Sequence, residues 1–287
     1  MDGIILASKC GTYEVMNASG KKTICKPLGI FRHKNLKPLV GDHINFDELE
    51  CTIKEIYPRK NHLIRPNVAN VDELAIVMSV SEPEFSSLLI DKFVSYANYF
   101  KIPACVIISK IDKDLENKVV EAKINSLTKL GIKVIAFSSK TFEGIEEVKK
   151  LFDGKVVVLM GQTGVGKSSL LNVVVPDSKR EVGEYSKFLG RGKHQTKEVI
   201  LIPYGTGYIA DTPGFSSLEL PFYKEDLAKC FLGFNKLEAH CKFDNCLHIH
   251  EPDCEVKKAL RDDIIARDSY ENYLKISNEL IFKKDRF

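Results

Sequence analysis

The sequence of 287 residues lacks any long hydrophobic run. No segment approaches the roughly 18 consecutive apolar residues that a membrane-spanning helix needs. The N-terminus carries an acidic Asp2 and a short apolar run, Ile4–Ala7, where a secretory signal would have a basic region and a longer apolar stretch. Internal repeats and low-complexity linkers are also missing. We therefore expect a protein without a membrane partner that stays in the cytoplasm.

Net charge is small as well. Lys and Arg number 42 against 39 Asp and Glu, a formal charge of +3, which excludes a strongly basic tail and an acidic solvating protein. The excess lies in residues 1–70, which hold 11 basic and 7 acidic residues. A closely spaced basic set lies there: Lys21, Lys22, Lys26, Arg32, Lys34 and Lys37. This set indicates either a polyanion-binding surface or an ordinary solvated face.

Composition and length predict a multidomain globular protein. The chain is 44% hydrophobic and 28% charged, and at about 150 residues per domain its length allows two or three domains. Residues 1–70 show short β-type segments between turn signals, which predicts a five-stranded barrel of the OB type, a fold that commonly binds RNA. Residues 71–220 predict a parallel α/β sheet. Residues 221–287 predict a small helical domain, with helical stretches at Tyr223–Phe231 and Pro252–Leu280.

Strand and helix patterns alternate in the middle region. The apolar strand-like runs are Leu74–Val80, Val106–Ser109, Lys133–Phe137 and Lys155–Met160. The helical spacings are Ser86–Phe100, Leu115–Leu130 and Gly144–Phe152. This alternation predicts crossover helices that connect parallel strands.

A glycine-rich segment matches the phosphate-binding pattern G-x-x-x-x-G-K-[ST]. It comprises Gly161, Gln162, Thr163, Gly164, Val165, Gly166, Lys167 and Ser168, and Ser169 follows at the start of a helix-like stretch. Its glycines let the backbone wrap a phosphate at a helix N-terminus. We expect Lys167 to reach the β- and γ-phosphates and the Ser168 hydroxyl to bind Mg²⁺.

A second phosphate-side motif is Asp211-Thr212-Pro213-Gly214, which follows the strand-like Tyr208–Ala210. There Asp211 can hold Mg²⁺ through water and the Gly214 N–H can contact the γ-phosphate. An isolated D-x-P-G is usually only a turn, so its position after the phosphate loop supports this interpretation.

The base-reading candidates lie at two successive strand ends. Ser109, Lys110, Ile111 and Asp112 end one strand, and Ser138, Ser139 and Lys140 end the next. A carboxylate at Asp112 can accept hydrogen bonds from guanine N1–H and the 2-amino group, a donor pair that adenine lacks. A backbone N–H in Ser138–Lys140 could reach guanine O6. Together these segments predict guanine as the base.

Cysteine usage separates into two groups. Five of the eight cysteines are scattered and are interpreted as buried small hydrophobic residues in a reducing compartment: Cys10, Cys25, Cys51, Cys105 and Cys230. Cys241, Cys246 and Cys254 instead lie close together, with His240, His248 and His250 as competing imidazoles. Three thiolates and one imidazole suit a closed tetrahedral Zn²⁺ site. Such a site would stabilise a small domain that has little hydrophobic core of its own.

The order of these motifs resembles that of the circularly permuted GTPases. Ser109–Asp112 and Ser138–Lys140 precede Gly161–Ser168, Thr196 and Asp211–Gly214, whereas most GTPases have the phosphate loop first. The flanking regions narrow the resemblance to the small-ribosomal-subunit biogenesis GTPases (the RsgA/YjeQ family), and it covers nearly the whole chain. It implies GTP hydrolysis to GDP, the small ribosomal subunit and 16S rRNA as partners, and one structural zinc. The family's C-x₄-C-x-H-x₅-C spacing selects His248, and we expect a monomer.

The chain departs from the family pattern in two places. Position 109 is Ser where the family has Asn, so one hydrogen bond to the base or to the phosphate loop is expected to be weaker. The switch segment has Gln195 and Lys197 within the family's G-R-G-x-H-T-T-T pattern. The Mg²⁺-binding switch threonine is therefore carried over to Thr196 only.

Phe215 follows D-x-x-G where many GTPases have a water-orienting Gln. Either His194 in the switch loop or a group from the partner must then position the attacking water. We expect low intrinsic turnover that a docked small subunit raises. Two other functions stay open at this point: an RNA-binding scaffold with an idle nucleotide site, and an ATP-using kinase.

Overall fold

A computed structural model of the chain describes residues 1–33, 36–113, 118–175, 199–212 and 218–281. The chain forms two compact units. The first combines Met1–Leu74, Gly144–Met160 and Lys167–Gly214, and the second combines Ala75–Glu143, Gly161–Gly166 and Phe215–Phe287. Within the described ranges no helix is both long and apolar enough to cross a membrane.

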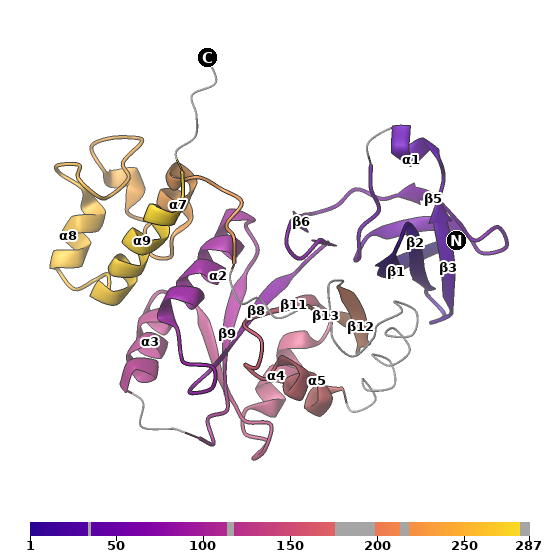
Figure 1. The fold of residues 1–287 in the computed structure, drawn as a ribbon, viewed down its shortest axis with the longest axis horizontal. Coiled ribbons are helices and arrows are strands. Elements are labelled where there is room, and N and C mark those ends of the chain that lie inside the picture. The colour runs from indigo at the N-terminus through magenta and orange to yellow at the C-terminus, as the bar shows by residue number, and fades with distance from the viewer. Residues whose placement is uncertain (34–35, 114–117, 176–198, 213–217, 282–287) are drawn as a thin grey trace. The chain divides into compact units, whose positions relative to one another are not determined.

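The first unit begins with a closed barrel (Figure 1). Its strands are β1 Asp2–Lys9, β2 Thr12–Asn17, β3 Lys22–Pro27, β4 His43–Asp47 and β5 Thr52–Ile56, with a short helix α1 Ile30–His33 after β3. Antiparallel pairing joins β1 to β2, β2 to β3, β4 to β5 and β4 to β1, while β3 runs parallel to β5. This closed five-stranded barrel confirms the OB-type prediction.

The barrel interior follows the two-residue period of strands. Val15, Cys25, Ile44, Phe46 and Ile53 are buried, and each lies on the inward face of its strand. Cys25 therefore behaves as a small core hydrophobe, as predicted, and burial raises the pKa of its thiol to about 11. Cys105 and Cys230 are also buried, but Cys10 and Cys51 are exposed, so the prediction is wrong for these two.

The Pro38–Asp42 segment fixes the edge of the barrel. Asp42 is fully buried, and its carboxylate accepts hydrogen bonds from Leu39 N–H at 2.7 Å and from Arg59 Nε at 2.6 Å and Nη2 at 2.8 Å. Gly41 has φ of 89°, and a Cβ there would overlap the carbonyl of Ala69, so only glycine fits. This segment has a structural role.

The rest of the first unit comprises a separate two-stranded sheet, β6 and β7, and part of the α/β region. Its elements are β6 His62–Leu63, β7 Val68–Ala69, α4 Ile145–Phe152, β11 Val156–Met160, α5 Lys167–Val174, β12 Ile200–Tyr204 and β13 Gly207–Asp211. β11 runs parallel to β13, which pairs antiparallel with β12. β11 is buried along its whole length, as an apolar strand covered on both faces should be.

The second unit holds the other strands of the α/β region. Its elements are β8 Glu73–Ser79, whose first two residues belong to the first unit, α2 Ser87–Tyr99, β9 Ala104–Ser109, α3 Lys118–Lys129 and β10 Lys133–Phe137. β9 lies between β8 and β10, and β9 and β10 run parallel in register from Cys105–Lys133 to Ser109–Phe137. The predicted parallel α/β arrangement is confirmed.

Helices complete the second unit, with α9 beside α2 in Figure 1. They are α7 Lys224–Cys230, the 3₁₀ turn η1 Glu238–His240, α8 Glu255–Arg261 and α9 Arg267–Glu279. The predicted helical stretch Pro252–Leu280 is therefore two helices. Asp263 adopts φ of 53° after α8 and Ile265 is buried, so the chain turns there. The residue limits 1–70, 71–220 and 221–287 stay a prediction.

Candidate functional site

Ser109 connects the end of β9 to the phosphate loop. Its side chain is 2% exposed, and its hydroxyl donates to the Val165 carbonyl at 2.5 Å, with the Met78 carbonyl at 3.1 Å. A serine hydroxyl has a single proton, so the short contact to Val165 takes it. The structure thus gives Ser109 a hydrogen bond to the phosphate loop at the position where the family has Asn.

Lys110 makes a second connection to the same loop. Its backbone adopts φ of 60°, a left-handed conformation that turns the chain sharply after β9. Its ammonium donates to the Gly164 carbonyl at 2.8 Å and to the Glu82 carbonyl. The base-reading segment and the phosphate loop are therefore joined through two adjacent side chains.

Asp112 is held as an ionised acceptor. The Ser138 hydroxyl donates to its Oδ1 at 2.7 Å, and Lys140 Nζ lies 3.3 Å from its Oδ2. The Ser138 hydrogen bond, with Lys140 in support, lowers the pKa of Asp112 below its usual value. A carboxylate has about four lone-pair positions, so capacity is left for two donors from a base.

Ser138 also organises its own loop. Its hydroxyl accepts from the N–H groups of Lys140 and Thr141, both at 3.2 Å, and its N–H donates to the Glu143 carbonyl at 3.1 Å. Among the described residues, nothing accepts a hydrogen bond from Ser139 N–H. That N–H fits the expected role toward guanine O6.

Glycines in the phosphate loop are required by the backbone. Gly161, Gly164 and Gly166 have φ of 149°, 86° and 103°. A Cβ on Gly161 would overlap the carbonyl of Val77, so the loop passes directly against β8. Val165 and Ile111 are buried, whereas Thr163, Ser168 and Ser169 are exposed and Gln162 is half-buried.

Lys167 and Asp211 define the phosphate side of the first unit. Lys167 begins α5, is 7% exposed, and burial lowers its pKa to about 8, while the charge of Asp211 opposes this shift. Asp211 ends β13, and the next residue, Thr212, donates its hydroxyl to the Leu159 carbonyl at 2.5 Å. A buried ammonium at a helix N-terminus suits a polyanionic ligand.

Several predicted residues lie outside the described ranges. They are His194, Thr196, Pro213, Gly214 and Phe215 of the nucleotide site and Lys34 of the basic set. Their predicted roles in the switch, at the γ-phosphate and toward a polyanion stay predictions.

The structure brings the four predicted metal ligands together in the second unit. The donor atoms of Cys241, Cys246, His248 and Cys254 all lie within 4.8 Å of one another. His248 Nδ1 faces the sulfurs of Cys254 at 3.4 Å and Cys241 at 3.7 Å. Three thiols and one imidazole at these separations could contract onto a tetrahedral Zn²⁺, whose bonds to sulfur are about 2.3 Å long.

The loop that carries the proposed metal ligands is held in place by hydrogen bonds that involve no metal. The Glu251 carboxylate accepts from the N–H groups of Leu247 at 2.7 Å, Ile249 at 2.9 Å and His250 at 3.1 Å. Burial opposes the charge on Glu251, but these donors lower its pKa overall. Tyr270 and Tyr273 of α9 donate to the carbonyls of His248 and Leu247 at 2.7 and 2.5 Å.

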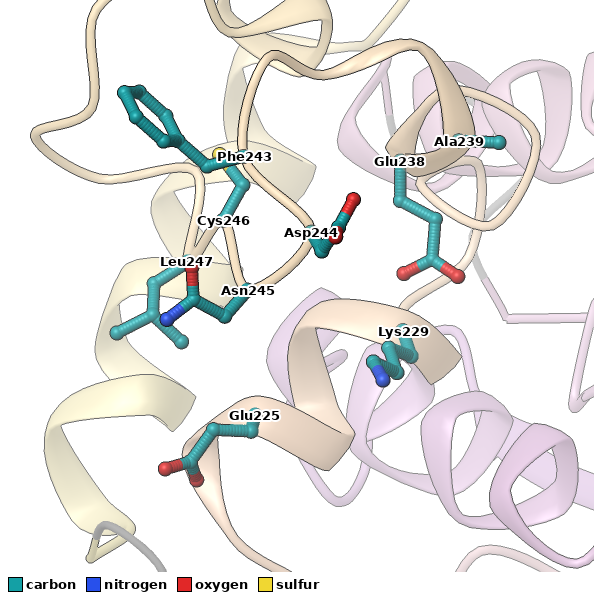
Figure 2. Close-up of a pocket in the computed structure, with 9 residues that line it drawn as sticks. All are labelled: Glu225, Lys229, Glu238, Ala239, Phe243, Asp244, Asn245, Cys246 and Leu247. Atoms are coloured by element: carbon teal, nitrogen blue, oxygen red, sulfur yellow. The ribbon is translucent and has the colours of Figure 1, made fainter.

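A cleft of about 200 Å³ lies next to the ligand loop (Figure 2). Cys246 and Leu247 form part of its wall, and the carboxylates of Glu225, Glu238 and Asp244 outnumber the single amine of Lys229. This lining gives the neighbourhood of the cluster a negative potential, which favours a cation.

Comparison with known proteins decides the family. The model of the RsgA GTPase family matches residues 56–221, and that of the RsgA N-terminal domain matches residues 2–52. The chain belongs to the RsgA GTPase family. This membership makes it a GTP hydrolase.

Individual relatives extend the RsgA match over the full length. The small ribosomal subunit biogenesis GTPase RsgA of Caldanaerobacter subterraneus subsp. tengcongensis is 40% identical, with 100% of this chain and 98% of the relative covered. The protein of the same name from Mycoplasmopsis agalactiae is 40% identical, with 98% of both chains covered.

Solved structures agree with the RsgA assignment. YjeQ from Thermotoga maritima has a TM-score of 0.81 at 35% identity, with 97% of this chain and 98% of that one covered. YloQ, described as a circularly permuted GTPase, has a TM-score of 0.79 at 33% identity, with 100% and 96% covered. The predicted family and fold are confirmed.

Sequence reasoning missed two contacts in this RsgA-family chain. The Glu82–Pro83 turn before α2 contacts Lys110, and the Thr212 hydroxyl bonds to the Leu159 carbonyl of β11. Thr212 is recognised as part of the D-x-P-G motif, but that motif does not predict its bond to Leu159. The Glu82–Pro83 turn is 28 residues from Lys110, and no local pattern links the two.

Proposed function

We propose that this chain is a GTP-hydrolysing factor in the assembly of the small ribosomal subunit. One observation carries the nucleotide part of the proposal: Ser109 and Lys110 bond to the phosphate-loop carbonyls of Val165 and Gly164. Asp112 follows two residues later as an ionised acceptor. These contacts support a site that takes guanine and phosphates together. The relatives' name, small ribosomal subunit biogenesis GTPase, supports the assembly role.

Each phosphate-side residue has a distinct role in this proposal. Lys167 neutralises charge on the β- and γ-phosphates, and Gly214 N–H contacts the γ-phosphate. The exposed Ser168 hydroxyl and Thr196 would hold Mg²⁺ directly, with Asp211 acting through water. A magnesium ion held there would neutralise charge that develops on the phosphate oxygens. Phosphoryl transfer then needs mainly positioning, which the rigid loop supplies.

The attacking water needs a partner for its orientation, because Phe215 cannot polarise it. His194 or a group on the docked small subunit supplies this, so intrinsic turnover is low and the small subunit raises it. The basic set of the barrel binds 16S rRNA in the monomeric, cytoplasmic factor.

The Cys241–Cys254 cluster holds one structural Zn²⁺ in this proposal. Four protein ligands close the coordination sphere and leave no position for a reactive water. The cluster therefore stabilises the helical region and takes no part in hydrolysis.

Steady-state phosphate release from GTP and ATP, with and without purified small subunits, tests the proposal. We expect GTP to be preferred, the small subunit to accelerate its hydrolysis, and Lys167→Ala to abolish the acceleration. Lys150→Ala, which changes an exposed lysine on α4 outside the nucleotide loops, is the control and should keep most activity. Equal rates with and without subunits would contradict the partner, and equal use of ATP would contradict the base.

A further inference from the structure

A buried polar cluster joins α9 to the helices that follow β8 and β9. We call it the α9 junction: Ser87 and Asp91 on α2, Lys123 on α3, and Ser269 and Asn272 on α9. Lys123 Nζ lies 2.8 Å from both Asp91 carboxylate oxygens and 3.0 Å from Ser269 Oγ. The Asn272 amide nitrogen donates to Asp91 Oδ2 at 2.8 Å and to Ser87 Oγ at 3.0 Å.

The geometry of the junction matters more than its energy. Lys123 and Asp91 are each 2% exposed and Asn272 is 4% exposed, so the charges have been removed from water almost completely. A buried ion pair is often no more stabilising than hydrophobic residues of the same size. Directional bonds do, however, restrict how α9 can lie against α2. Asn272 contributes most to this restriction, because its one amide group bonds two residues on α2.

The first turn of α2 leads directly to the nucleotide loops. Ser86 caps α2 by accepting from Leu89 N–H at 3.3 Å, and the Glu82–Pro83 turn comes just before it. The Glu82 carbonyl accepts from Lys110, which also donates to Gly164 in the phosphate loop. The Glu82 carboxylate pairs with Lys113 at 2.6 Å. The path from Asn272 to the phosphate loop therefore combines these hydrogen bonds with the short stretch of backbone between Glu82 and Ser87.

We propose that Asn272 is a positioning residue of the nucleotide site. It holds the first turn of α2, and through the Glu82–Pro83 turn and Lys110 it holds the carbonyl of Gly164 in place. The proposal rests on the guanine-nucleotide site proposed above. Because Asn272 acts on the phosphate loop rather than on Asp112, it sets affinity for the diphosphate portion without changing the choice of base.

Asn272→Ala tests this, and Asn278→Ala is the matched control because Asn278 is an exposed asparagine on the same helix. We expect Asn272→Ala to weaken GDP and GTP binding by about fivefold, within the usual range of coupling between sites, and to leave the GDP-to-ADP ratio unchanged. Hydrogen exchange at residues 161–166 should accelerate in Asn272→Ala and stay unchanged in Asn278→Ala. A loss of thermal stability without these two changes would overturn the proposal.

Two further variants keep the test decisive if Asn272→Ala folds poorly. Ser87→Ala removes one of the two Asn272 contacts and should weaken both nucleotides by about twofold. Combining Asp91→Asn with Asn272→Asp exchanges the two polar groups. The double variant should bind nucleotide more tightly than the sum of the losses in Asp91→Asn and Asn272→Asp alone predicts. If neither Asn272→Ala nor Ser87→Ala alters nucleotide affinity, or the Asp91→Asn/Asn272→Asp exchange restores none of it, the inference fails. A wild-type chain that binds no guanine nucleotide would instead refute the proposed function.

Discussion

The proposed metal cluster and the proposed guanine-reading edge both depend on polar groups, but these groups come from different lengths of chain. Cys241, Cys246, His248 and Cys254 lie within fourteen residues, and Glu251 fixes the loop between them. The guanine edge combines Ser109 and Asp112 with Ser138 and Val165, which come from three different loops. Substitutions in the metal cluster should therefore have large effects on the structure of the surrounding region. Substitutions at the guanine-reading edge should instead reduce nucleotide binding to different degrees.

Cys254→Ser should have the largest effect, because it removes one of the four proposed zinc ligands. Structural zinc contributes an apparent binding free energy of about 10–16 kcal/mol, and without it the region loses the fold that the metal stabilises. We expect zinc content to fall from one per chain to none and α8 and α9 to become sensitive to protease. Metal analysis and limited proteolysis measure both.

Cys10→Ser is the control for this change, since Cys10 is exposed and outside the cluster. It should keep both the zinc and the protease resistance. A Cys254→Ser protein that retains zinc and its helical content would contradict the expectation that a change in this cluster has a large effect on the surrounding structure.

Asp112→Ala should have the next largest effect, and on nucleotide selectivity rather than folding. It removes the acceptor of two hydrogen bonds from guanine, and hydrogen bonds to charged groups contribute about 1.5–3 kcal/mol each. We expect GTP affinity to fall by about a hundredfold or more while ATP affinity changes little. Competition binding with GTP and ATP measures this.

Asp153→Ala, at an exposed aspartate that ends α4, serves as the control. Equal losses for GTP and ATP in Asp112→Ala would mean that Asp112 supports the loop without reading the base.

The same contrast explains what could be predicted from the sequence. The barrel and the parallel strands follow from local sequence patterns, and the structure confirms them. The four proposed metal ligands are chosen from their spacing together with the family pattern, and the structure places them in one cluster. The α9 junction could not be predicted, because charged residues such as Lys123 and Asp91 on helices usually face solvent. They are also 32 residues apart, and their partner Asn272 is 181 residues from Asp91. Only tertiary packing reveals such a group.

Replacing Lys167 should change how the stability of the nucleotide-free protein depends on pH. Burial lowers the pKa of Lys167 to about 8 from 10.5, so between these values the unfolded chain binds more protons than the folded one. The free energy of unfolding should therefore receive a contribution that rises with pH above about 8, by at most about 1.4 kcal/mol per pH unit. Urea unfolding between about pH 7.5 and 9.5 measures this slope.

Lys167→Met should remove this contribution and so lower the slope of the unfolding free energy against pH relative to wild type, whereas Lys150→Met, at an exposed lysine, should leave the slope unchanged. Phosphates would restore a favourable environment for the ammonium, so GDP binding near pH 9 should be accompanied by proton uptake. Identical slopes in wild type and Lys167→Met would show that the ammonium of Lys167 is well solvated or paired.

Ser109→Ala should have the smallest effect. It tests whether the contact between Ser109 and the phosphate loop supports nucleotide binding separately from base selection by Asp112. The change removes the donor to the buried Val165 carbonyl, a loss of about 1 kcal/mol, so GDP and GTP binding should weaken by about fivefold. Selectivity for guanine over adenine should be unchanged, because Asp112 keeps its contact with Ser138.

Ser139→Ala is the control, since it removes a neighbouring hydroxyl and leaves the backbone N–H in place. Ser109→Asn restores the residue type of the family and offers two donor protons, one for Val165 and one for the base. If Ser109→Ala instead reduced selectivity more than affinity, Ser109 would be a base-reading residue, and the division of labour between Ser109 and Asp112 would be wrong.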